Sequence, residues 1–376
     1  MSRKILTPEH YTVGWLCALD CEYLASVLML DERHDPPTYS NSSDQNVYTF
    51  GEINQHNVVI VRMPTGETGK VSAALTAHFL KESFKMKIYL FVGIGGGYPS
   101  NPHWKDQPIN LGDVVVGSPK KTGNRAVVEY DRGRATPGGF ASFSILDRPI
   151  RQLVSLVDHL EGNAECGHSF FDRHLVPLKT ENLAKRSPQV TFEVNKFMYP
   201  GPQYDILFKS ESTHEGESDP TCPNCDETAI LRRGRPNDKP LFHRGTIASG
   251  DSVIQDAERR DKLSKECDDA ICFEMEGAGV MDLTRCLVIR GISDYADTHK
   301  NYIWHDYASA TAAAFAKEIL CTLPVTTLKE VESRPLSTHD SPVEASSSVG
   351  TLIPDNPDQH QPLAPLARLF RRKDDC

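Results

Sequence analysis

The sequence predicts an α/β fold built on a mixed or mostly parallel sheet. Short apolar runs typical of buried strands alternate with longer amphipathic segments typical of helices. This alternation is the pattern of folds in which helices pack on the faces of one sheet. In addition, carboxylates or glycine-rich segments directly follow several of the apolar runs. They are therefore expected at the carboxyl ends of strands, where such folds gather their sites.

The first third of the chain supplies these elements in a regular order. A buried strand is predicted at 11–19, and a helix follows through about residue 30, with Asp20 in position to cap its N-terminus. A hairpin is predicted over 46–53 and 57–63, and an amphipathic helix over 69–84. The run at 88–92 predicts a buried strand that opens into a glycine-rich loop at 93–97, and 112–116 predicts another strand.

The middle of the chain gives a much weaker pattern. From about 104 to 239 it is rich in proline, glycine and charged residues, which we interpret as an insertion. Strands are then predicted at 246–250, before Glu274 and at 286–292, with helices at 276–283 and 305–323. The domain is expected to span 11–324 after an N-terminal extension of residues 1–10. Residues 325–376 are expected to be a disordered tail, because they are rich in Pro, Ser, Asp and Glu and poor in aromatics.

Composition excludes some classes of partner. The chain has 376 residues and a net charge of −10, which argues against a nucleic-acid-binding surface. No apolar run reaches the roughly 18 residues of a membrane helix. The N-terminus lacks the apolar segment of a secretory signal. We therefore expect a cytoplasmic protein, with the nucleus as the alternative, and neither nucleic acid nor membrane as a partner.

The chain contains ten cysteines, most simply read as reduced. Several lie in apolar runs and are expected in the core. Cys222 and Cys225 differ, because they form a Cys-x-x-Cys pair in a polar loop with His214 upstream. These three residues could bind zinc, but a structural site needs a fourth ligand. The candidates for that ligand are Cys166, His168 and His243. A loop with two free thiols is the simpler interpretation, so no metal or other cofactor is expected.

Three carboxylates stand out because each follows a predicted strand. They are Glu22, Glu276 and Asp294. If the strands are neighbours in the sheet, one cleft collects all three side chains. A carboxyl group kept away from bulk water can stay protonated and act as a general acid at neutral pH. Such an acid is what the cleavage of a bond between a sugar and a base requires. A single carboxylate in this position is more often a helix cap or an ion-pair partner.

Six motifs follow one another along the chain. They are residues 14–22, 65–74, 93–97, 248–254, Met275-Glu276 and Ser293-Asp294. In this order they resemble the purine/uridine phosphorylase superfamily, in particular its nucleosidase branch and the 5′-methylthioadenosine/S-adenosylhomocysteine nucleosidases, and the likeness covers roughly residues 11–323. Residues 290–301 and Cys222-x-x-Cys225-Asp226 carry a tighter resemblance, to the fungal nucleoside-phosphorylase-like domains found in NLR-type proteins.

The resemblance implies a three-layer fold with a central mixed sheet flanked by helices. It also implies roles for the site residues. Glu22 would activate water, Glu276 would bind the ribose, and Asp294 would be the general acid, kept neutral by burial. Substrate contacts are expected from Gly95, Gly96, Val253, Ile254, Met275, Ser293 and Arg290. Val253 stands where the bacterial enzymes have an aromatic residue that stacks on adenine.

The resulting hypothesis is hydrolysis of the N-glycosidic bond of a purine nucleoside or nucleotide, without a cofactor. One alternative is phosphorolysis, which needs cations near the nucleophile, such as Arg62 or Arg125. Another is a nucleotide-binding signalling domain with little catalysis. Candidates for contacts to 5′-phosphates are Lys300, His299, Arg125 and Arg232. Relatives commonly oligomerise, so a homo-oligomer, a dimer or larger, is expected.

Overall fold

The computed structural model describes residues 3–38, 41–99, 108–137, 139–143, 146–168, 171–179, 196–216, 219–233 and 239–325. All of them lie in one compact unit, Met1–Glu330, and the second unit is Val331–Cys376. The predicted disordered tail at 325–376 therefore falls almost wholly outside the described residues. The domain boundaries at 11 and 324 stay predictions.

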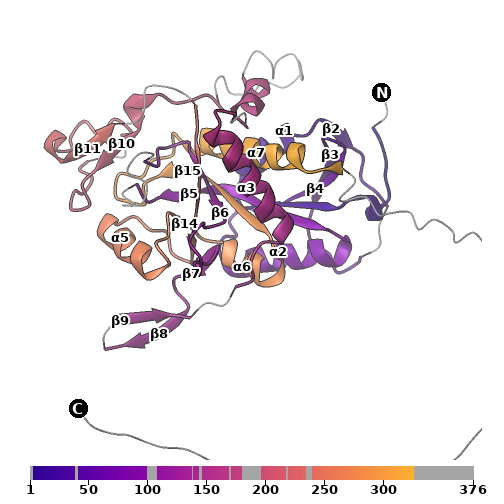
Figure 1. The fold of residues 1–376 in the computed structure, drawn as a ribbon, viewed down its shortest axis with the longest axis horizontal. Helices are drawn as coiled ribbons and strands as arrows, with labels where there is room; N and C mark the ends of the chain where they lie inside the picture. The colour runs from indigo at the N-terminus through magenta and orange to yellow at the C-terminus, as the bar shows by residue number, and fades with distance from the viewer. Residues whose placement is uncertain are drawn as a thin grey trace, which may run out of the picture. The chain divides into compact units, whose positions relative to one another are not determined.

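The described elements alternate as the sequence predicts (Figure 1). The strands are β1 (Val13–Cys17), β2 (Glu32–His34), β3 (Tyr48–Ile53), β4 (His56–Arg62), β5 (Ile88–Gly97), β6 (Val114–Gly117), β7 (Val127–Glu129), β8 (Gly133–Thr136), β9 (Gly139–Ser142), β10 (Ile206–Phe208), β11 (Ile230–Arg233), β12 (Phe242–Gly245), β13 (Ile247–Ser249), β14 (Cys272–Glu274) and β15 (Leu287–Asp294). The α-helices are α1 (Asp20–Leu28), α2 (Lys70–Ser83), α3 (Arg151–Glu165), α5 (Ala257–Glu266), α6 (Gly277–Leu283) and α7 (His305–Thr322). Short 3₁₀ helices are η1 (Pro8–His10), η3 (Phe171–Leu178), η4 (Pro202–Tyr204) and η5 (Glu227–Ala229).

One mixed sheet of 11 strands organises the unit. Its main path has the order β12-β6-β15-β5-β1-β4-β3-β2, and β14, β13 and β7 branch from β5. The long strand β5 pairs in parallel with β1 and β15 and, near its end, antiparallel with β14. The carboxyl ends of β1, β5 and β15 therefore meet at one edge of the sheet. Glu22 and Asp294 follow or end two of these strands.

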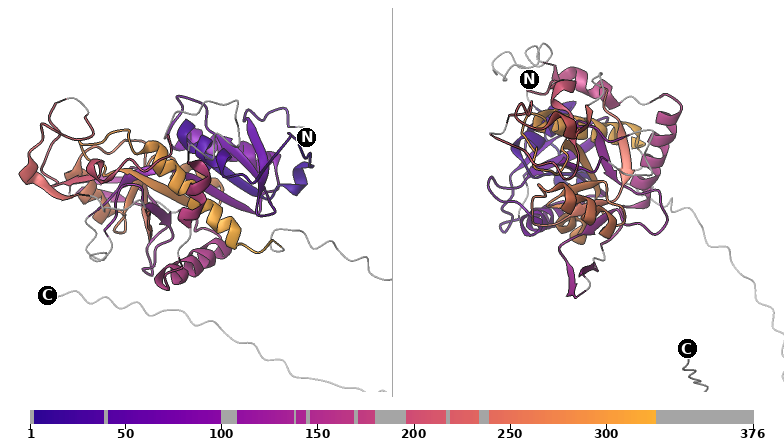
Figure 2. Two further views of the ribbon diagram at one scale, coloured as in Figure 1. Left: turned by 90° about the horizontal axis from the view of Figure 1, so that it is seen from above. Right: turned by 90° about the vertical axis from the view of Figure 1, so that its left-hand side faces the viewer.

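Helices cover both faces of the sheet, which gives three layers (Figures 1 and 2). On β1, Val13, Trp15 and Cys17 join the core beneath α1, α3 and α7, whereas Leu16 joins the core on the side of α2 and α6. Alternate side chains of β1 thus point into opposite cores. Both faces of the strand are buried, as expected for a central strand. The α/β prediction, with a central mixed sheet flanked by helices, is confirmed.

Most predicted elements are found within a few residues of their predicted ends. The hairpin turn is formed by Asn54 and Gln55, both with positive φ (48° and 66°), which suits a tight connection between antiparallel strands. The weak middle region contains α3 and two small hairpins, β8–β9 and β10–β11. Helix α5 was not predicted, because its sequence is mostly charged and only four of its residues are buried.

Two local predictions were wrong. Asp20 does not cap α1, because the N-cap position is Leu19 and Asp20 instead pairs with Arg62. The orphan N–H groups are bound by the Glu22 carboxylate, which accepts from Ala18 and Leu19. The glycine-rich segment 93–97 is not a loop but the second half of β5.

The glycines of β5 let charged side chains pack against bare backbone. A Cβ atom on Gly93 would collide with Oε1 of Glu22 and Nη1 of Arg290. A Cβ atom on Gly96 would lie 2.8 Å from Oδ1 of Asp294. The strand therefore needs glycine where the carboxylates approach it.

Among the described residues, no helix has both the length and the apolar character that crossing a bilayer would require.

We expect Gly93→Ala to lower the free energy of unfolding by about 1–3 kcal/mol, because the added methyl group overfills a closed polar cluster. Urea unfolding followed by circular dichroism measures the change. The matched control is Gly162→Ala in α3, where an added Cβ meets nothing within 4 Å. In a helix this control should raise stability by up to about 1 kcal/mol. Equal effects of the two substitutions would contradict the packing argument.

Candidate active site

A cavity of about 420 Å³ lies at the carboxyl edge of the sheet. Glu22, Glu276 and Asp294 all line it, so the structure brings the three predicted carboxylates together. They come from α1, from the turn that opens α6, and from the end of β15. The volume is in the range usual for small-molecule pockets.

Backbone N–H groups just after β1 and within β5 hold Glu22 in place. Its Oε2 accepts hydrogen bonds from the N–H groups of Ala18 (2.7 Å) and Leu19 (2.9 Å), and its Oε1 accepts from Ile94 (2.8 Å). The side chain is buried. A carboxylate has about four acceptor positions, so these three bonds leave room for one donor such as a water molecule.

Glu276 lies in a group of carboxylates around one arginine. Its Oε1 accepts from the N–H of Gly69 at 3.2 Å. Burial raises the pKa of Glu276 to about 7, and the nearby carboxylate of Glu274 adds to the increase, while Arg290 opposes it. Glu276 therefore titrates close to neutral pH, unlike an ordinary glutamate.

Glu274 lies behind Glu276 and bonds to Arg290. Its carboxylate also accepts from the backbone N–H groups of Glu276 and Gly277, at 2.8–3.1 Å. The guanidinium of Arg290 is fully buried and stacks 4.1 Å above the ring of Phe91. Because Glu274 binds the guanidinium here, Arg290 does not line the cavity. Its predicted role in direct substrate contact is therefore not supported by its position.

Asp294 differs from the expectation that burial keeps it neutral. Burial would raise the pKa of Asp294, but the ammonium of Lys300, 2.6 Å from its Oδ2, outweighs this effect. Hydrogen bonds from the Ala296 N–H and the Ser293 hydroxyl, each 2.9 Å, act in the same direction. The pKa of Asp294 is consequently below its ordinary value, and the carboxyl is ionised while Lys300 stays beside it.

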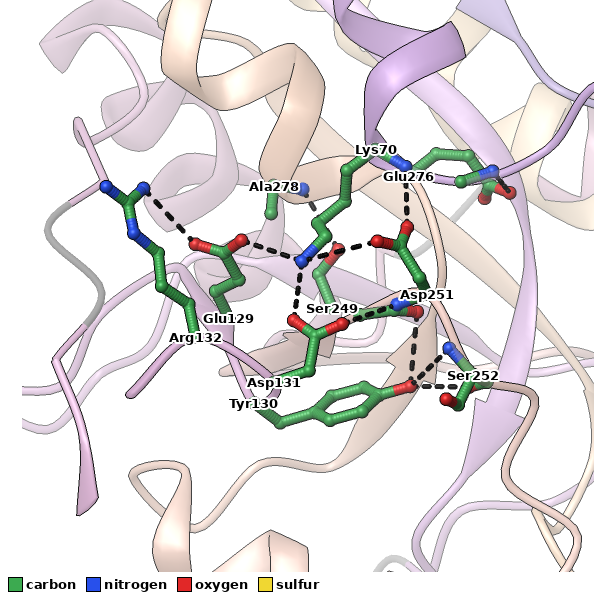
Figure 3. Close-up of polar contacts among 12 residues, drawn as sticks. Lys70, Glu129, Tyr130, Asp131, Arg132, Ser249, Asp251, Ser252, Glu276 and Ala278 are labelled. Carbon is green, nitrogen blue, oxygen red and sulfur yellow. Dashed lines mark hydrogen bonds and ion pairs between the residues drawn. The ribbon is translucent and has the colours of Figure 1, made fainter. Parts of the chain in front are cut away.

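Lys70 holds the N-terminal end of α2 against a group of three carboxylates beside the cavity (Figure 3). The Lys70 ammonium lies 2.8 Å from Glu129, 2.5 Å from Asp131 and 3.6 Å from Asp251. The backbone N–H of Lys70 also donates to Asp251, at 2.9 Å. With three carboxylates around it, Lys70 acts as a structural clamp beside Glu276 and does not face the cavity.

The other predicted substrate contacts divide into two groups. Those that line the cavity are Gly95, Gly96, Val253, Ile254, Met275, Ser293 and Lys300. Three predicted phosphate contacts do not. Arg125 is bound by Asp268 through Nε at 2.8 Å and Nη2 at 3.0 Å, and His299 is buried against Phe208 with their ring centroids 3.9 Å apart. Arg232 also lies elsewhere, with its guanidinium on Asn110 and on the carbonyl oxygen of Ile109.

The sequence analysis gave no role to several of the lining residues. Among them are Phe273, Glu274, Tyr302 and His305. Phe273 and Glu274 immediately precede Met275-Glu276, so their neighbourhood was the available signal. His305, at the start of α7, has no such signal. Burial lowers the pKa of His305 to about 4, and Lys300 contributes, so its imidazole is neutral.

The candidate zinc ligands lie together, outside the lining of the cavity. His214 contacts both Cys222 and Cys225, and His299 forms a group with His214 and Cys225. None of the three ligands suggested to complete the site takes that position. His243, for example, lies 3.0 Å from Asp113 instead.

Comparison with known proteins shows which family and which relatives the chain resembles. The Phosphorylase superfamily profile matches residues 12–168. A nucleotide-binding leucine-rich repeat (NLR)-like protein of Hyaloscypha variabilis is 35% identical over 87% of this chain and 31% of its own length. A death domain-containing ATP nucleosidase of Amphimedon queenslandica is 35% identical over 71% of this chain and 40% of its own length. The chain thus spans less than half the length of both relatives.

The fold agrees with a solved structure. The 5′-methylthioadenosine/S-adenosylhomocysteine nucleosidase from Neisseria meningitidis, in complex with methylthio-immucillin-A, superposes with a TM-score of 0.51. The match covers 83% of this chain and 99% of that chain at 16% identity. Residues 12–168 thus match the phosphorylase superfamily, and the described fold is similar to that of a solved nucleosidase.

Proposed function

We propose that the protein hydrolyses the N-glycosidic bond of a purine nucleoside or nucleotide, releasing the base and the sugar. The observation that carries the proposal is that Glu22, Glu276 and Asp294 line one cavity. The name of the Amphimedon queenslandica relative, an ATP nucleosidase, supports the same class of reaction.

The positions of Glu22 and Asp294 suit attack and departure on opposite sides of a sugar carbon. Glu22 contacts the backbone at Ile94, and Asp294 packs against Gly96, two residues further along β5. Two residues of strand span roughly 7 Å. Acid and base groups separated by about this distance leave room for a water molecule in direct displacement at a sugar carbon. Glu22 would orient and deprotonate that water.

Departure of the base requires a proton at its N7. We assign its delivery to the Asp294–Lys300 pair, in place of a permanently neutral Asp294. A substrate phosphate that draws Lys300 away removes the charge that keeps Asp294 ionised. Burial then favours the protonated carboxyl, so Asp294 takes up a proton from solvent water and can pass it to the base. Substrate binding would thus switch the acid on.

Glu276 would bind the ribose hydroxyls and oppose the positive charge that develops on the sugar. That charge is characteristic of glycoside cleavage. An ionised carboxylate gains most in the transition state, where the charge is largest. Met275, beside it in the cavity wall, would pack on the sugar.

The charges around the cavity favour water over phosphate as the nucleophile. Among the residues that line it, four are carboxylates, Glu22, Glu274, Glu276 and Asp294, and Lys300 is the one lysine or arginine. Arg62, one of the cations considered for phosphorolysis, binds Asp20 and Thr65. Arg125, the other, is bound by Asp268. A doubly charged phosphate would meet mainly negative charge.

The proposed substrate carries 5′-phosphates, because Lys300 is the cation available to them in the cavity wall. Homo-oligomerisation and a cytoplasmic location remain predictions from the sequence.

Asp294→Asn should lower the rate of base release by about 10²–10⁴-fold, since the amide cannot act as an acid. The assay compares adenosine, inosine, guanosine, AMP and ATP, with and without inorganic phosphate, and identifies the sugar product. Asp282→Asn, which alters an exposed carboxyl on α6, is the control and should keep full activity. Release that requires phosphate and forms ribose 1-phosphate would establish phosphorolysis. Tight binding of the panel without turnover would establish a signalling domain.

For Glu276, kcat/KM should rise with pH and level off above an apparent pKa of about 7, because the ionised form is the active one. Glu276→Gln should abolish this rise of kcat/KM with pH, together with most of the activity. The raised pKa means that ionised Glu276 lowers stability as pH rises from the unfolded to the folded pKa. Glu276→Gln should therefore unfold at an equal or higher temperature than the wild type at pH 8. A profile that falls through pH 7 would instead make Glu276 an acid.

Lys300→Met should separate phosphorylated from unphosphorylated substrates. We expect kcat/KM for AMP or ATP to fall by about 10–100-fold, the usual cost of losing a charge-assisted hydrogen bond. The value for adenosine should change much less. Lys262→Met, at an exposed lysine of α5, is the control and should leave both values unchanged. Equal losses on all substrates would show that Lys300 does not act by binding a substrate phosphate.

A further inference from the structure

We propose that His214, Cys222, Cys225 and His299 form a structural zinc site that fastens the inserted segment to the wall of the cavity. His214, Cys222 and Cys225 come from the insertion, and His299 follows β15. Two thiolates and two imidazoles are a ligand set typical of tetrahedral structural zinc. The sequence analysis favoured two free thiols because no fourth ligand was evident, and the fold supplies one in His299.

Both thiols converge on the same nitrogen. Nδ1 of His214 lies 3.7 Å from Sγ of Cys222 and 3.4 Å from Sγ of Cys225. One ring nitrogen can make a single good hydrogen bond, so it cannot bond well to both thiols. A tetrahedral zinc ion with the usual bond lengths places its ligand atoms roughly 3.3–3.8 Å apart. The observed separations fit a shared metal better than a hydrogen-bonded group.

The burial of the polar His299 side chain is difficult to explain without a metal. It is 8% exposed, and neither ring nitrogen has a hydrogen-bond partner among the described residues. Buried polar groups are nearly always satisfied, so two such nitrogens indicate a missing partner. Ligand atoms of His299, His214 and Cys225 all lie within 4.8 Å of one another. Metal coordination would satisfy one of the two nitrogens.

The surroundings hold these ligands in place. Phe208 stacks on the His299 ring with an interplanar angle of 7°. The His214 N–H donates to the Thr298 hydroxyl at 2.8 Å, which ties the two contributing segments together. Oδ2 of Asp297 lies 3.8 Å from Nδ1 of His299. A carboxylate beside a metal-binding imidazole commonly orients that ring.

The site would affect the cavity through a short path. His299 is adjacent to Lys300, which pairs with Asp294. A metal on His299 would fix the segment that carries this lysine. The metal lies outside the cavity lining, so its role is structural.

The test is the zinc content of the full chain, purified without chelators and measured by inductively coupled plasma mass spectrometry. About one zinc per chain is expected for the wild type. The double variant Cys222→Ser/Cys225→Ser should lose at least about tenfold of it. Cys166→Ser, at an exposed cysteine outside the group, is the matched control and should retain it. Full zinc retention by the double variant would overturn the proposal.

A second measurement avoids dependence on the folding of the double variant. Wild-type protein is stripped of metal and titrated with Co²⁺. Tetrahedral coordination by two thiolates should give intense visible bands and sulfur-to-metal charge-transfer absorption, and one equivalent of Zn²⁺ should remove both. His299→Asn should weaken the Co²⁺ bands. A six-coordinate spectrum, no binding, or a Cys222–Cys225 disulfide found by mass spectrometry of the purified wild type would refute the zinc site.

Discussion

A single buried guanidinium, that of Arg290, balances the charges beneath the candidate active site. It bonds to Glu274, stacks on Phe91 and lies near Glu22 and Glu276. Burial alone would lower the pKa of Arg290, but the carboxylates of Glu274, Glu22 and Glu276 raise it above its ordinary value. Three buried carboxylates without such a cation would be very costly to desolvate. Because Arg290 occupies the interior of β15 and packs against the glycines of β5, the carboxylates can reach the cavity from one side.

This arrangement drives two neighbouring carboxyl groups in opposite directions. Burial and the nearby Glu274 raise the pKa of Glu276, whereas Lys300 and three hydrogen bonds lower that of Asp294 despite burial. Pairs of titratable groups whose environments separate their pKa values are typical of acid–base sites. Here one of the two environments depends on a lysine that a ligand can move. The ionisation of Asp294 is therefore a property of the free cavity and would change when a phosphate competes for Lys300.

The described part of the insertion contributes no residue to the cavity lining but packs beside one of its walls. Its hairpin β10–β11 packs near the segment that follows β15, where Tyr295 donates to Asp205 at 2.6 Å and His214 donates to Thr298. Burial raises the pKa of Asp205 to about 6, with the Tyr295 hydroxyl opposing the increase. A metal shared between His299 and the two cysteines would add a third and stronger connection. The wall that carries Lys300 would then depend on a segment that compositional reasoning leaves as an irregular loop.

The sequence by itself determined the α/β alternation, the first half of the strand that ends in the glycines and the three carboxylates that meet in the cavity. These features depend on local periodicity and on residues placed next to strand ends, which a linear chain displays directly. It could not determine that Arg290, Arg125 and His299 are bound away from the cavity, or that Lys300 ionises Asp294. It also missed α5, whose few buried residues leave little periodic signal. Only the tertiary structure decides these points, because pKa values and ligand sets depend on contacts between residues that lie far apart in the sequence. The hydrogen bond from the Ile94 N–H to Glu22, which joins residues 72 positions apart, is one such contact.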